Sequence, residues 1–329
     1  KIPAGLRQFI EQQIGRASPK EREVLEAASV VGMEFSAAAV AAALEEEVEA
    51  VEQLCEALAR RSQLLHANGV SEWPDGTVAA GYRFLHALYQ DVVYAQVPAG
   101  RRISLHRQVG KRLETAYGTQ ARELAAELAV HFERGRDTRR AVQYLWQAGE
   151  NAIRRNAPQE AILHLTKGLK VLETRPDTQE RAQQELMLQI SLGAPLMHTK
   201  GWGQPEVERC YTRARSLCQR LGETPELFPV LIGLWMFYNT RAELQIAREI
   251  GEQCLSLAQR QHDPALLLAA YAALGNTVFF QGELVLAQEY FEQGLALYDP
   301  QQHRSYALYG IDLGVGGRGN AAFALWLLG

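Results

Sequence analysis

The chain has 329 residues with a formal net charge of −4 and an isoelectric point of about 6.1. This balance gives no electrostatic basis for binding nucleic acid or an anionic membrane surface, and no apolar run approaches the roughly 18 residues that a membrane-spanning helix needs. The four cysteines form no CxxC pair, so we expect buried, reduced thiols in a cytoplasmic protein.

Residues 1–120 are predicted to form a helical module. Ser18-Pro19-Lys20-Glu21 combines a capping box with a proline at the first helical position, which predicts a helix that ends near Gly32. Periodic apolar residues predict further helices at 5–16, 36–44, 48–61, 86–96 and 100–117.

A short β-hairpin is predicted inside this module. Leu64-Leu65-His66-Ala67 is a strand candidate, and Tyr82-Arg83-Phe84 is the returning strand. Asn68-Gly69 and Pro74-Asp75-Gly76 are turn signals between them. Three short helices followed by a β-hairpin is the order of a winged helix.

The third helix of a winged helix often binds DNA, but the corresponding segment here is acidic. Six carboxylates lie on it or just before it, at Glu45, Glu46, Glu47, Glu49, Glu52 and Glu56. Carboxylates that face a phosphate backbone repel it, so we expect this module to pack against protein and do not expect DNA as a partner.

Residues 222–300 contain the same unit twice, 40 residues apart. The segments AELQIAREIGEQCLSLA (242–258) and GELVLAQEYFEQGLALY (282–298) share eight identical positions. A fixed period in this range indicates stacked supersecondary units. Each unit is predicted to be a helical hairpin, with Gly282 in the turn between its helices and Pro300 after the second helix.

The repeat resembles the tetratricopeptide repeat (TPR). Two short patterns carry the resemblance: Tyr271, Leu274 and Gly275 in the first helix, and Ala287, Phe291 and Gly294 in the second. The small residues belong where the two helix axes cross, and the large ones fill the spaces around them. The period of 40, where about 34 is usual, implies longer helices or loops. We therefore expect a mainly α fold: a winged-helix-like module over 1–120 and a TPR-like α-solenoid of helical hairpins over 121–329.

Several motifs together resemble the region that follows the ATPase module in large bacterial signal-transducing ATPases of the STAND or AAA type. The motifs are Leu25–Phe35 (LEAASVVGMEF), Tyr82–Leu88 (YRFLHAL), Arg102 with His106, and Ala324–Gly329 (ALWLLG). Members of this family are fused to adenylate or guanylate cyclase, protein kinase or LuxR-type DNA-binding domains. The resemblance implies that the chain is a piece of a longer protein, cut at both ends.

The sequence contains no GxxxxGK[ST] phosphate-binding loop. We therefore predict that this segment is not an enzyme, has no catalytic residue and binds no cofactor of its own. The resemblance places ATP or ADP in an NTPase domain elsewhere in the parent protein, and makes that domain an intramolecular partner.

The resemblance also implies a role for His86. In the family, a winged-helix histidine touches the β-phosphate of bound ADP, and His86 stands at the corresponding strand-to-helix junction. A helix N-terminus and an imidazole both favour an anion. The flanking Leu85 and Ala87 depart from the family motif, and the alternative is a histidine that caps or packs the hairpin.

Three other features of the sequence resemble binding sites. Gly314–Gly319 fits G-x-G-x-x-G, but no βαβ unit surrounds it, so it is expected to be a loop between repeat helices rather than a dinucleotide site. The eight histidines contain no HxxxH pair, and no metal site is expected. Trp202, in a Gly- and Pro-containing loop, is either a buried plug or a binding aromatic.

The repeats together with the resemblance imply a sensor or interaction arm that binds a protein, peptide or small effector on its repeats and relays binding to the NTPase domain. From helix-face position, the candidate groove residues are Tyr238, Asn239, Asn276 and Phe280. The alternative is a free-standing TPR scaffold or a transcription regulator with a winged-helix DNA-binding module.

Overall fold

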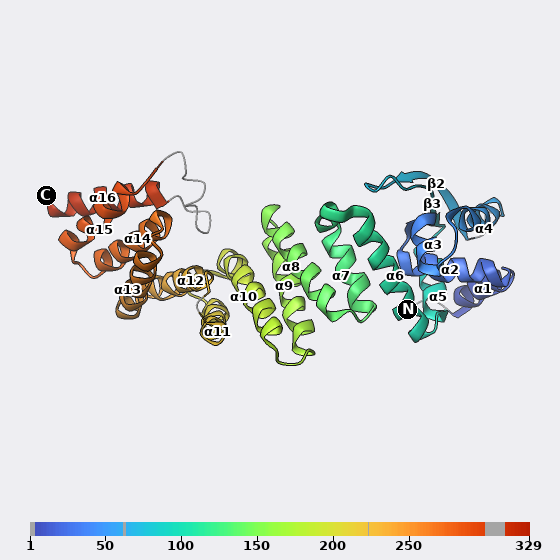
Figure 1. The fold of residues 1–329 in the computed structure, drawn as a ribbon, viewed down its shortest axis with the longest axis horizontal. Coiled ribbons are helices and arrows are strands. Elements are labelled where there is room, and N and C mark those ends of the chain that lie inside the picture. Colours follow the sequence, from blue (N-terminus) through green and yellow to red (C-terminus); the bar gives the residue numbers. More distant parts are fainter. Residues whose placement is uncertain (1–3, 62–63, 223, 300–312) are drawn as a thin grey trace. The chain divides into compact units, whose positions relative to one another are not determined.

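The computed structural model describes residues 4–61, 64–222, 224–299 and 313–329 (Figure 1). Its contacts divide the chain into two compact units, Lys1–Ala148 and Gly149–Gly329. The domain boundary predicted at residue 120 falls in the 3₁₀ helix η1 (Gly118–Leu124). Because α7 (Ala125–Arg134) packs on α6 (Ala99–Tyr117), the first unit continues past this point.

The first unit begins with helices that the sequence predicts. They are α1 (Ala4–Gly15), α2 (Pro19–Val31), α3 (Ala37–Leu44) and α4 (Val48–Arg60). The capping box at the start of α2 is confirmed. The Ser18 amide donates to Glu21 Oε2 over 2.8 Å, and the Glu21 amide donates to Ser18 Oγ over 3.3 Å.

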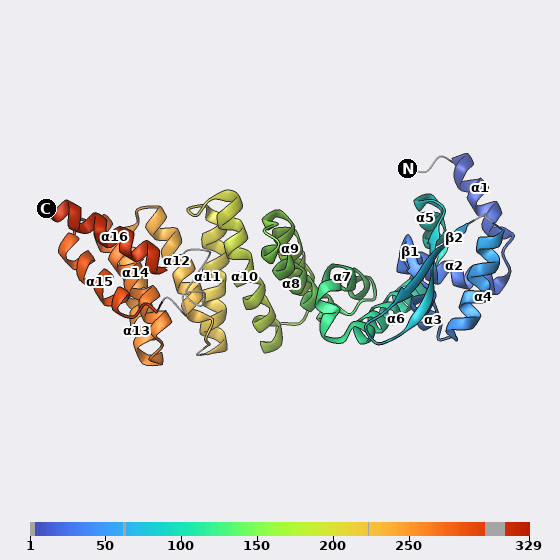
Figure 2. The ribbon, with the colours of Figure 1, turned by 90° about the horizontal axis from the view of Figure 1, so that it is seen from above.

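A three-stranded antiparallel sheet follows the order β1-β3-β2. Its strands are β1 (Glu34–Ser36), β2 (Leu65–Glu72) and β3 (Val78–Phe84), and Figure 2 shows β2 and β3 beside α4. The sequence did not indicate β1, which pairs with β3 and places Phe35 against the rings of Tyr82 and Phe84. The chain order α2-β1-α3-α4-β2-β3 is winged-helix-like.

The hairpin turn differs from the prediction at Asn68-Gly69. These residues lie inside β2, where the pairing register shifts between Ala67 and Val70 and Gly69 has φ +75°. A bulge therefore absorbs the Asn-Gly pair. The chain reverses at the predicted second signal, where the Trp73 amide donates to Thr77 O over 2.9 Å and Gly76 has φ +83°.

The tip of this hairpin is fixed to α6 by one arginine. Arg112 NH1 lies 2.7 Å from Asp75 Oδ2, its NH2 donates to Thr77 Oγ1 over 2.6 Å, and its guanidinium lies 4.7 Å from the Trp73 ring centroid. The Arg112 hydrogen bond lowers the pKa of Asp75 to about 2. The hairpin is thereby held against the helical part of its own unit.

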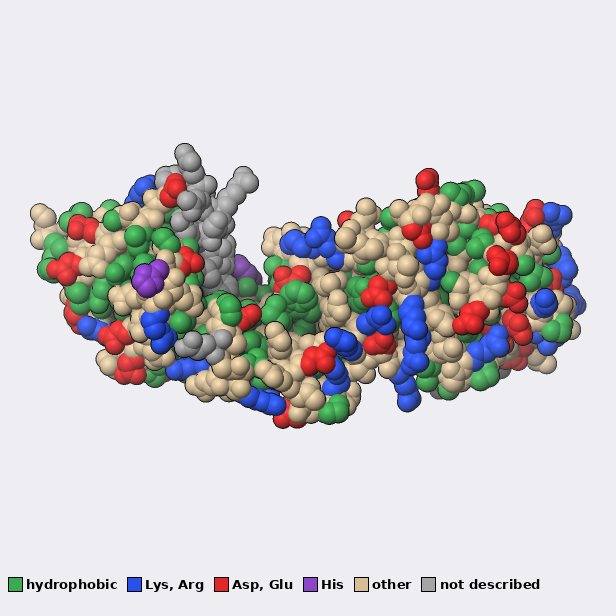
Figure 3. Space-filling view, viewed as in Figure 1, with side chains coloured by type: hydrophobic (Ala, Val, Ile, Leu, Met, Phe, Trp, Pro, Cys, Tyr) green, Lys and Arg blue, Asp and Glu red, His purple; other side chains and the backbone are tan. Residues whose placement is uncertain are grey.

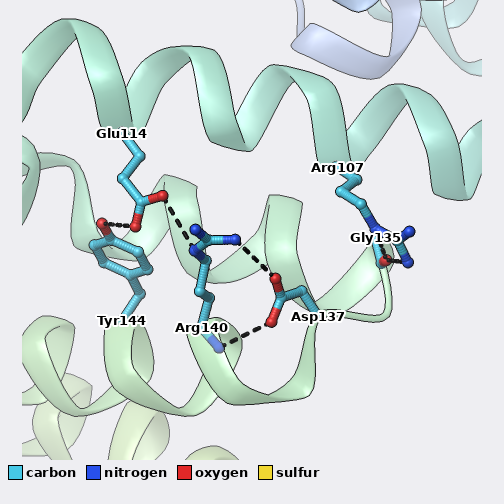
Figure 4. Close-up of polar contacts among 6 residues, drawn as sticks. All are labelled: Arg107, Glu114, Gly135, Asp137, Arg140 and Tyr144. Atoms are coloured by element: carbon cyan, nitrogen blue, oxygen red, sulfur yellow. Dashed lines mark hydrogen bonds and ion pairs between the residues drawn. The ribbon is translucent and has the colours of Figure 1, made fainter.

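The remaining helices of the first unit are α5 (Ala87–Gln96), α6, α7 and the start of α8 (Thr138–Arg154). Figure 4 shows how α6 holds the α7–α8 connection. Glu114 on α6 accepts from Tyr144 Oη over 2.8 Å and lies 3.1 Å from Arg140 Nε, while Arg140 also pairs with Asp137. The ring of Phe132 stacks on that of Tyr144 at 5.5 Å.

The second unit is a stack of antiparallel helices that follow one another in chain order (Figures 1 and 2). The helices are α9 (Pro158–Glu173), α10 (Gln179–Lys200), α11 (Pro205–Leu221), α12 (Leu227–Thr240), α13 (Leu244–Gln261), α14 (Pro264–Phe280), α15 (Leu284–Ala296) and α16 (Leu313–Leu328). Each helix packs chiefly on the next, and α12, α14 and α16 also contact in sequence. This is the predicted TPR-like α-solenoid.

Small residues lie at the helix crossings as predicted. A Cβ added to Gly275 on α14 would lie 2.6 Å from the Phe291 ring on α15, so only glycine fits there without a shift. Ala287 is fully buried beside Phe291. The long period comes from long helices, because α13 and α14 have 18 and 17 residues and only His262 and Asp263 separate them.

From α7 onward, four turns between successive helices of the described chain share one backbone conformation. Arg136, Asn156, Ala242 and Gly282 each have φ between +55° and +84°. In each copy the following amide donates to the carbonyl five residues earlier, as from Glu283 to Val278 and from Glu243 to Tyr238. This is a Schellman motif, which satisfies carbonyls that the helix end leaves free.

The predicted thiols are confirmed as free and buried: Cys55, Cys210, Cys218 and Cys254. Burial raises the pKa of the Cys210 thiol to about 12, so it stays protonated and unreactive. No helix in the described ranges has the length and apolar character to cross a membrane. The predicted helix-ending Pro300 lies outside the described residues.

Candidate ligand pocket

A pocket of about 250 Å³ opens on the side of the second unit where α12, α14 and α16 follow one another. We call it the repeat pocket. Its walls come from these three helices and from Trp202, which precedes α11. These are the first helices of successive hairpins, so the pocket spans three neighbouring repeats.

Small side chains of α14 create the space. Ala269, Ala272 and Ala273 line the pocket, and Gly316 and Gly317 of α16 face it without side chains. Helix α14 is apolar almost all round, because it lies between α13 and α15 and also contacts α12 and α16. On the side of α14 that faces the pocket, small residues leave space between the large apolar residues of the neighbouring helices.

A hydrogen-bond chain fixes the α12 wall. Trp235 Nε1 donates to Thr277 Oγ1 over 2.8 Å, and Thr277 Oγ1 donates to the Ala273 carbonyl over 2.9 Å. A threonine hydroxyl has one proton, which this second bond uses. The Asn239 amide lies 3.5 Å from the same hydroxyl and is therefore only loosely held.

A second chain joins α14 to α16. Asn276 Nδ2 donates to the Ala272 carbonyl over 2.8 Å, and Asn320 Nδ2 donates to Asn276 Oδ1 over 2.6 Å. These bonds fix the orientation of both amides, because each nitrogen must face an acceptor. The side-chain oxygen of Asn320, Oδ1, has no hydrogen-bond partner within the described part of the chain.

None of the described residues that line the repeat pocket is charged. Two indoles, three carboxamides, one hydroxyl, two large aliphatic side chains and small residues make up the wall. A buried ion without a partner is strongly disfavoured. The pocket is thus suited to a neutral group that stacks on an indole and hydrogen-bonds to an amide.

Two of the four predicted groove residues, Asn239 and Asn276, line this pocket. Tyr238 and Phe280 do not. The Tyr238 hydroxyl donates to Glu208 on α11 over 2.8 Å, and Phe280 is 61% exposed with its ring edge-on to Phe279. Tyr238 lies one residue before Asn239, and this step turns its side chain by about 100° around the helix. Phe280 is the last residue of α14, about one turn beyond Asn276, and so lies past the pocket.

Sequence reasoning missed Trp235 and Asn320, and left Trp202 open between a plug and a binding aromatic. Trp202 is half-buried on the pocket wall. One sequence signal could have pointed to Asn320. Asn239 and Asn276 each stand near the end of a first helix, and Asn320 follows Gly316 by four residues, as Asn239 follows Trp235.

The expected loop at Gly314–Gly319 is wrong, since these residues lie within helix α16. Glycine in a helix costs about 1 kcal/mol relative to alanine. Gly317 is buried beside Leu295 on α15, where an added Cβ would make an ordinary contact at 3.6 Å, so packing does not demand glycine at this position.

His86 lies in the first unit, exposed at the N-terminus of α5. Its Nδ1 accepts from the Leu88 amide over 3.1 Å, so the imidazole caps this helix, as the alternative interpretation holds. The cap uses only Nδ1 and leaves Nε2 directed to its surroundings. The two roles considered for His86 are therefore compatible.

A buried histidine pair lies elsewhere in the first unit. His106 Nδ1 is 3.1 Å from His131 Nδ1, and His106 Nε2 is 3.0 Å from the Tyr94 hydroxyl. Burial, with His131 and the cations Arg134 and Arg102 nearby, lowers the pKa of His106 to about 3. Burial and Arg134 lower the pKa of His131 to about 4.

Arg101 and Arg102, which precede His106 on α6, make contacts within the first unit. Arg102 lies over the Tyr94 ring, and Arg101 pairs with Glu26 of α2. Within the described ranges, no three His, Cys, Asp or Glu side chains are placed to hold a metal ion.

Comparison with known proteins gave one kind of match. No protein-family model and no curated protein matches the sequence. Among solved structures, the chain is similar to a signal transduction ATPase with numerous domains (STAND) protein with a tetratricopeptide repeat sensor from Pyrococcus horikoshii. The two are 10% identical with a TM-score of 0.46, over all of this chain and 63% of that chain.

Proposed function

We propose that this chain is a non-catalytic sensor and interaction arm of a larger signal-transducing ATPase. The repeat pocket binds a protein or small effector, and the winged-helix-like unit relays that binding to an NTPase domain of the same polypeptide. The observation that carries the proposal is the repeat pocket itself: a concave, uncharged site built by three successive hairpins. ATP or ADP belongs to the NTPase domain.

The physical basis of sensing is the way in which the pocket is assembled. Its two hydrogen-bond chains connect α12 to α14 and α14 to α16. A ligand that contacts all three helices favours one spacing of the hairpins over others, and it shifts the solenoid by its difference in affinity between them. The NTPase domain, which the motifs that resemble signal-transducing ATPases imply, is the part of the parent protein that responds to that shift.

The first test is genetic. Reading the coding region upstream of Lys1 should show a GxxxxGK[ST] motif in frame, within about one domain's length. A start codon immediately before Lys1 would contradict the relay and leave a free-standing repeat protein.

The second test uses the full-length parent and release of a fluorescent ADP analogue. Ala272→Phe fills the repeat pocket from α14, whereas Val285→Phe adds the same side chain at a 63% exposed site on α15. We expect Ala272→Phe to change the release rate at least about threefold, which is about 0.7 kcal/mol of coupling, and Val285→Phe to leave it unchanged. Equal rates for wild type and both variants would reject the relay.

A further inference from the structure

The repeat pocket has a size that limits its ligand. Pockets for drug-sized molecules typically occupy about 300–1,000 Å³, and this one has about 250 Å³. The space accepts one ring and a few further atoms. Since the pocket is open on one side, the rest of a longer ligand can continue into solvent.

The walls of the pocket select the character of that ring. Trp202 and Trp235 offer aromatic surface, and among the described lining residues none carries a charge that could pair with an ion. Aromatic groups prefer offset or edge-on contacts with indoles. A carboxylate or ammonium in this space would lose its water without gaining a counter-charge.

The amides of the pocket select the polar part of the ligand. The Asn320 carbonyl is held in place by the bond from Asn320 Nδ2 to Asn276, and it is free to accept from a ligand N–H. Among the described residues, the Asn239 side chain is held by one long contact of 3.5 Å, so it can turn either edge of its amide toward a ligand. A fixed acceptor and an adaptable amide together match a group that carries both an N–H and a C=O.

We propose that the repeat pocket recognises an uncharged aromatic group joined to an amide. This inference rests on the proposed function and names the ligand class of the same site. The chemistry is found in a phenylalanine or tryptophan residue within a peptide, and also in a small neutral aromatic amide. Both contain a ring for the indoles and an amide for the asparagines.

The test measures binding of simple probes to the 329-residue chain by saturation-transfer NMR. N-acetyl-phenylalaninamide is expected to bind with a Kd of about 1 mM, as its size allows. N-acetyl-phenylalanine, which carries a carboxylate in place of the terminal amide, should bind at least about tenfold more weakly. Equal or tighter binding of the carboxylate would overturn the proposal.

The two sources of the ligand are separated by length. A pentapeptide with central phenylalanine, flanked by glycines and blocked at both ends, is compared with the single blocked residue. Tighter binding of the pentapeptide indicates a peptide that continues along the repeats, and equal binding indicates a small molecule. Absence of binding by both probes rejects the ligand class.

Variants place the binding in the repeat pocket. Ala272→Phe should abolish binding of N-acetyl-phenylalaninamide, and Asn320→Ala should weaken it about fivefold or more by removing the fixed acceptor. The controls are Val285→Phe and Gln245→Ala, at exposed positions on α15 and α13. Circular dichroism verifies that each variant is folded, and binding that survives in both pocket variants would overturn the proposal.

The inference and the proposed function can fail separately. If Ala272→Phe alters ADP release in the parent but the neutral probe does not bind, the relay stands and the ligand class is wrong. If the neutral probe binds in the pocket but Ala272→Phe leaves ADP release unchanged, the ligand class stands and the relay is wrong.

Discussion

At the residue scale, the repeated Schellman turn places different residues in the same left-handed backbone position. Gly282 adopts φ +84° between α14 and α15, and Ala242 adopts φ +58° forty residues earlier. Left-handed backbone is strained for alanine because its Cβ approaches the following carbonyl. The two repeats therefore offer a matched pair for measuring this strain.

We predict that Ala242→Gly raises the free energy of unfolding by about 1 kcal/mol and that Gly282→Ala lowers it by about the same amount. Urea denaturation followed by circular dichroism measures both. A substitution by glycine at an exposed helical site, Ile246→Gly on α13, should instead be destabilising. Changes of the same sign at Ala242 and Gly282 would contradict this account.

His86 combines a helix cap with a free ring nitrogen, and two substitutions separate these roles. Asparagine is a good N-cap whereas alanine is not. In the full-length parent, we predict that His86→Asn preserves the stability of the first unit and His86→Ala lowers it by about 1 kcal/mol, while both accelerate ADP release.

The control is His66→Ala, at an exposed position on β2. If ADP release stays normal in both His86 variants, the histidine has only its capping role. If His86→Asn restores normal release while His86→Ala does not, the cap rather than the imidazole matters.

At the element scale, the buried histidine pair joins α6 to α7, and Tyr94 connects it to α5. The Nδ1–Nδ1 contact of 3.1 Å holds one proton between two nitrogens, so a second proton breaks it. The charged groups around it are Arg102 of α6 and Arg134 of α7, with Asp91 of α5 and Glu127 of α7 on the same hollow. The nearest charges thus oppose protonation of the pair.

We predict that the first unit loses stability as the pH falls below about 6.5. The unfolded histidines then bind protons, whereas the folded pair, with pKa values of about 3 and 4, stays neutral. Because the unfolded state binds more protons, stability is full above pH 6.5 and declines below it, by about 2 kcal/mol for each histidine at pH 5.

Urea denaturation at pH 7.5 and pH 5 measures this loss. His131→Gln should reduce the difference between the two pH values, and His66→Gln should leave it unchanged. If the loss of stability between pH 7.5 and pH 5 is the same in wild type and His131→Gln, groups other than the histidine pair cause it.

The elements show where local sequence signals are sufficient. The capping box, the hairpin helices and the small residues at their crossings follow from spacing in the sequence. Strand β1 has only three residues, and its pairing with β3, which starts more than forty residues later, decides its conformation. Asn68-Gly69 resembles a turn locally, but the pairing of β2 with β3 continues past it. These features depend on distant partners.

The candidate site follows the same rule. Asn239 and Asn276 could be chosen from the helix face, because each is a polar residue in the last two turns of the first helix of its hairpin. Asn320 could not be chosen in this way, because the glycines around it favour a loop in the isolated sequence. In the folded chain these residues form helix α16, which packs against α15. The pocket as a whole appears only when three hairpins are stacked.

At the scale of the whole molecule, charge is distributed without a strong bias. Acidic and basic side chains are interspersed over the face in Figure 3, and the net charge is −4. The acidic helix α4 uses Glu52 to accept from the Ala80 amide of β3 over 2.7 Å, and Arg112 holds the hairpin tip. Glu49 and Glu56 remain exposed on α4, so this surface of the helix is acidic.

We predict that the chain gives no salt-dependent shift of duplex DNA in an electrophoretic mobility assay. Specific binding would need cations placed along the duplex backbone. The control is the Glu49→Lys, Glu56→Lys variant, which tests whether the acidic surface of α4 is what prevents binding. A shift by the wild-type chain that weakens with salt would favour the transcription-regulator alternative.

The repeat pocket has a consequence for how the second unit comes apart. In a stack where each helix packs chiefly on its neighbour, hairpins can open one at a time from an end. A molecule that touches α12, α14 and α16 together must be released before α16 can open. A bound ligand would then make the three hairpins open as one cooperative unit instead of one at a time. Amide hydrogen exchange would slow along the stack, well beyond the residues that the ligand contacts.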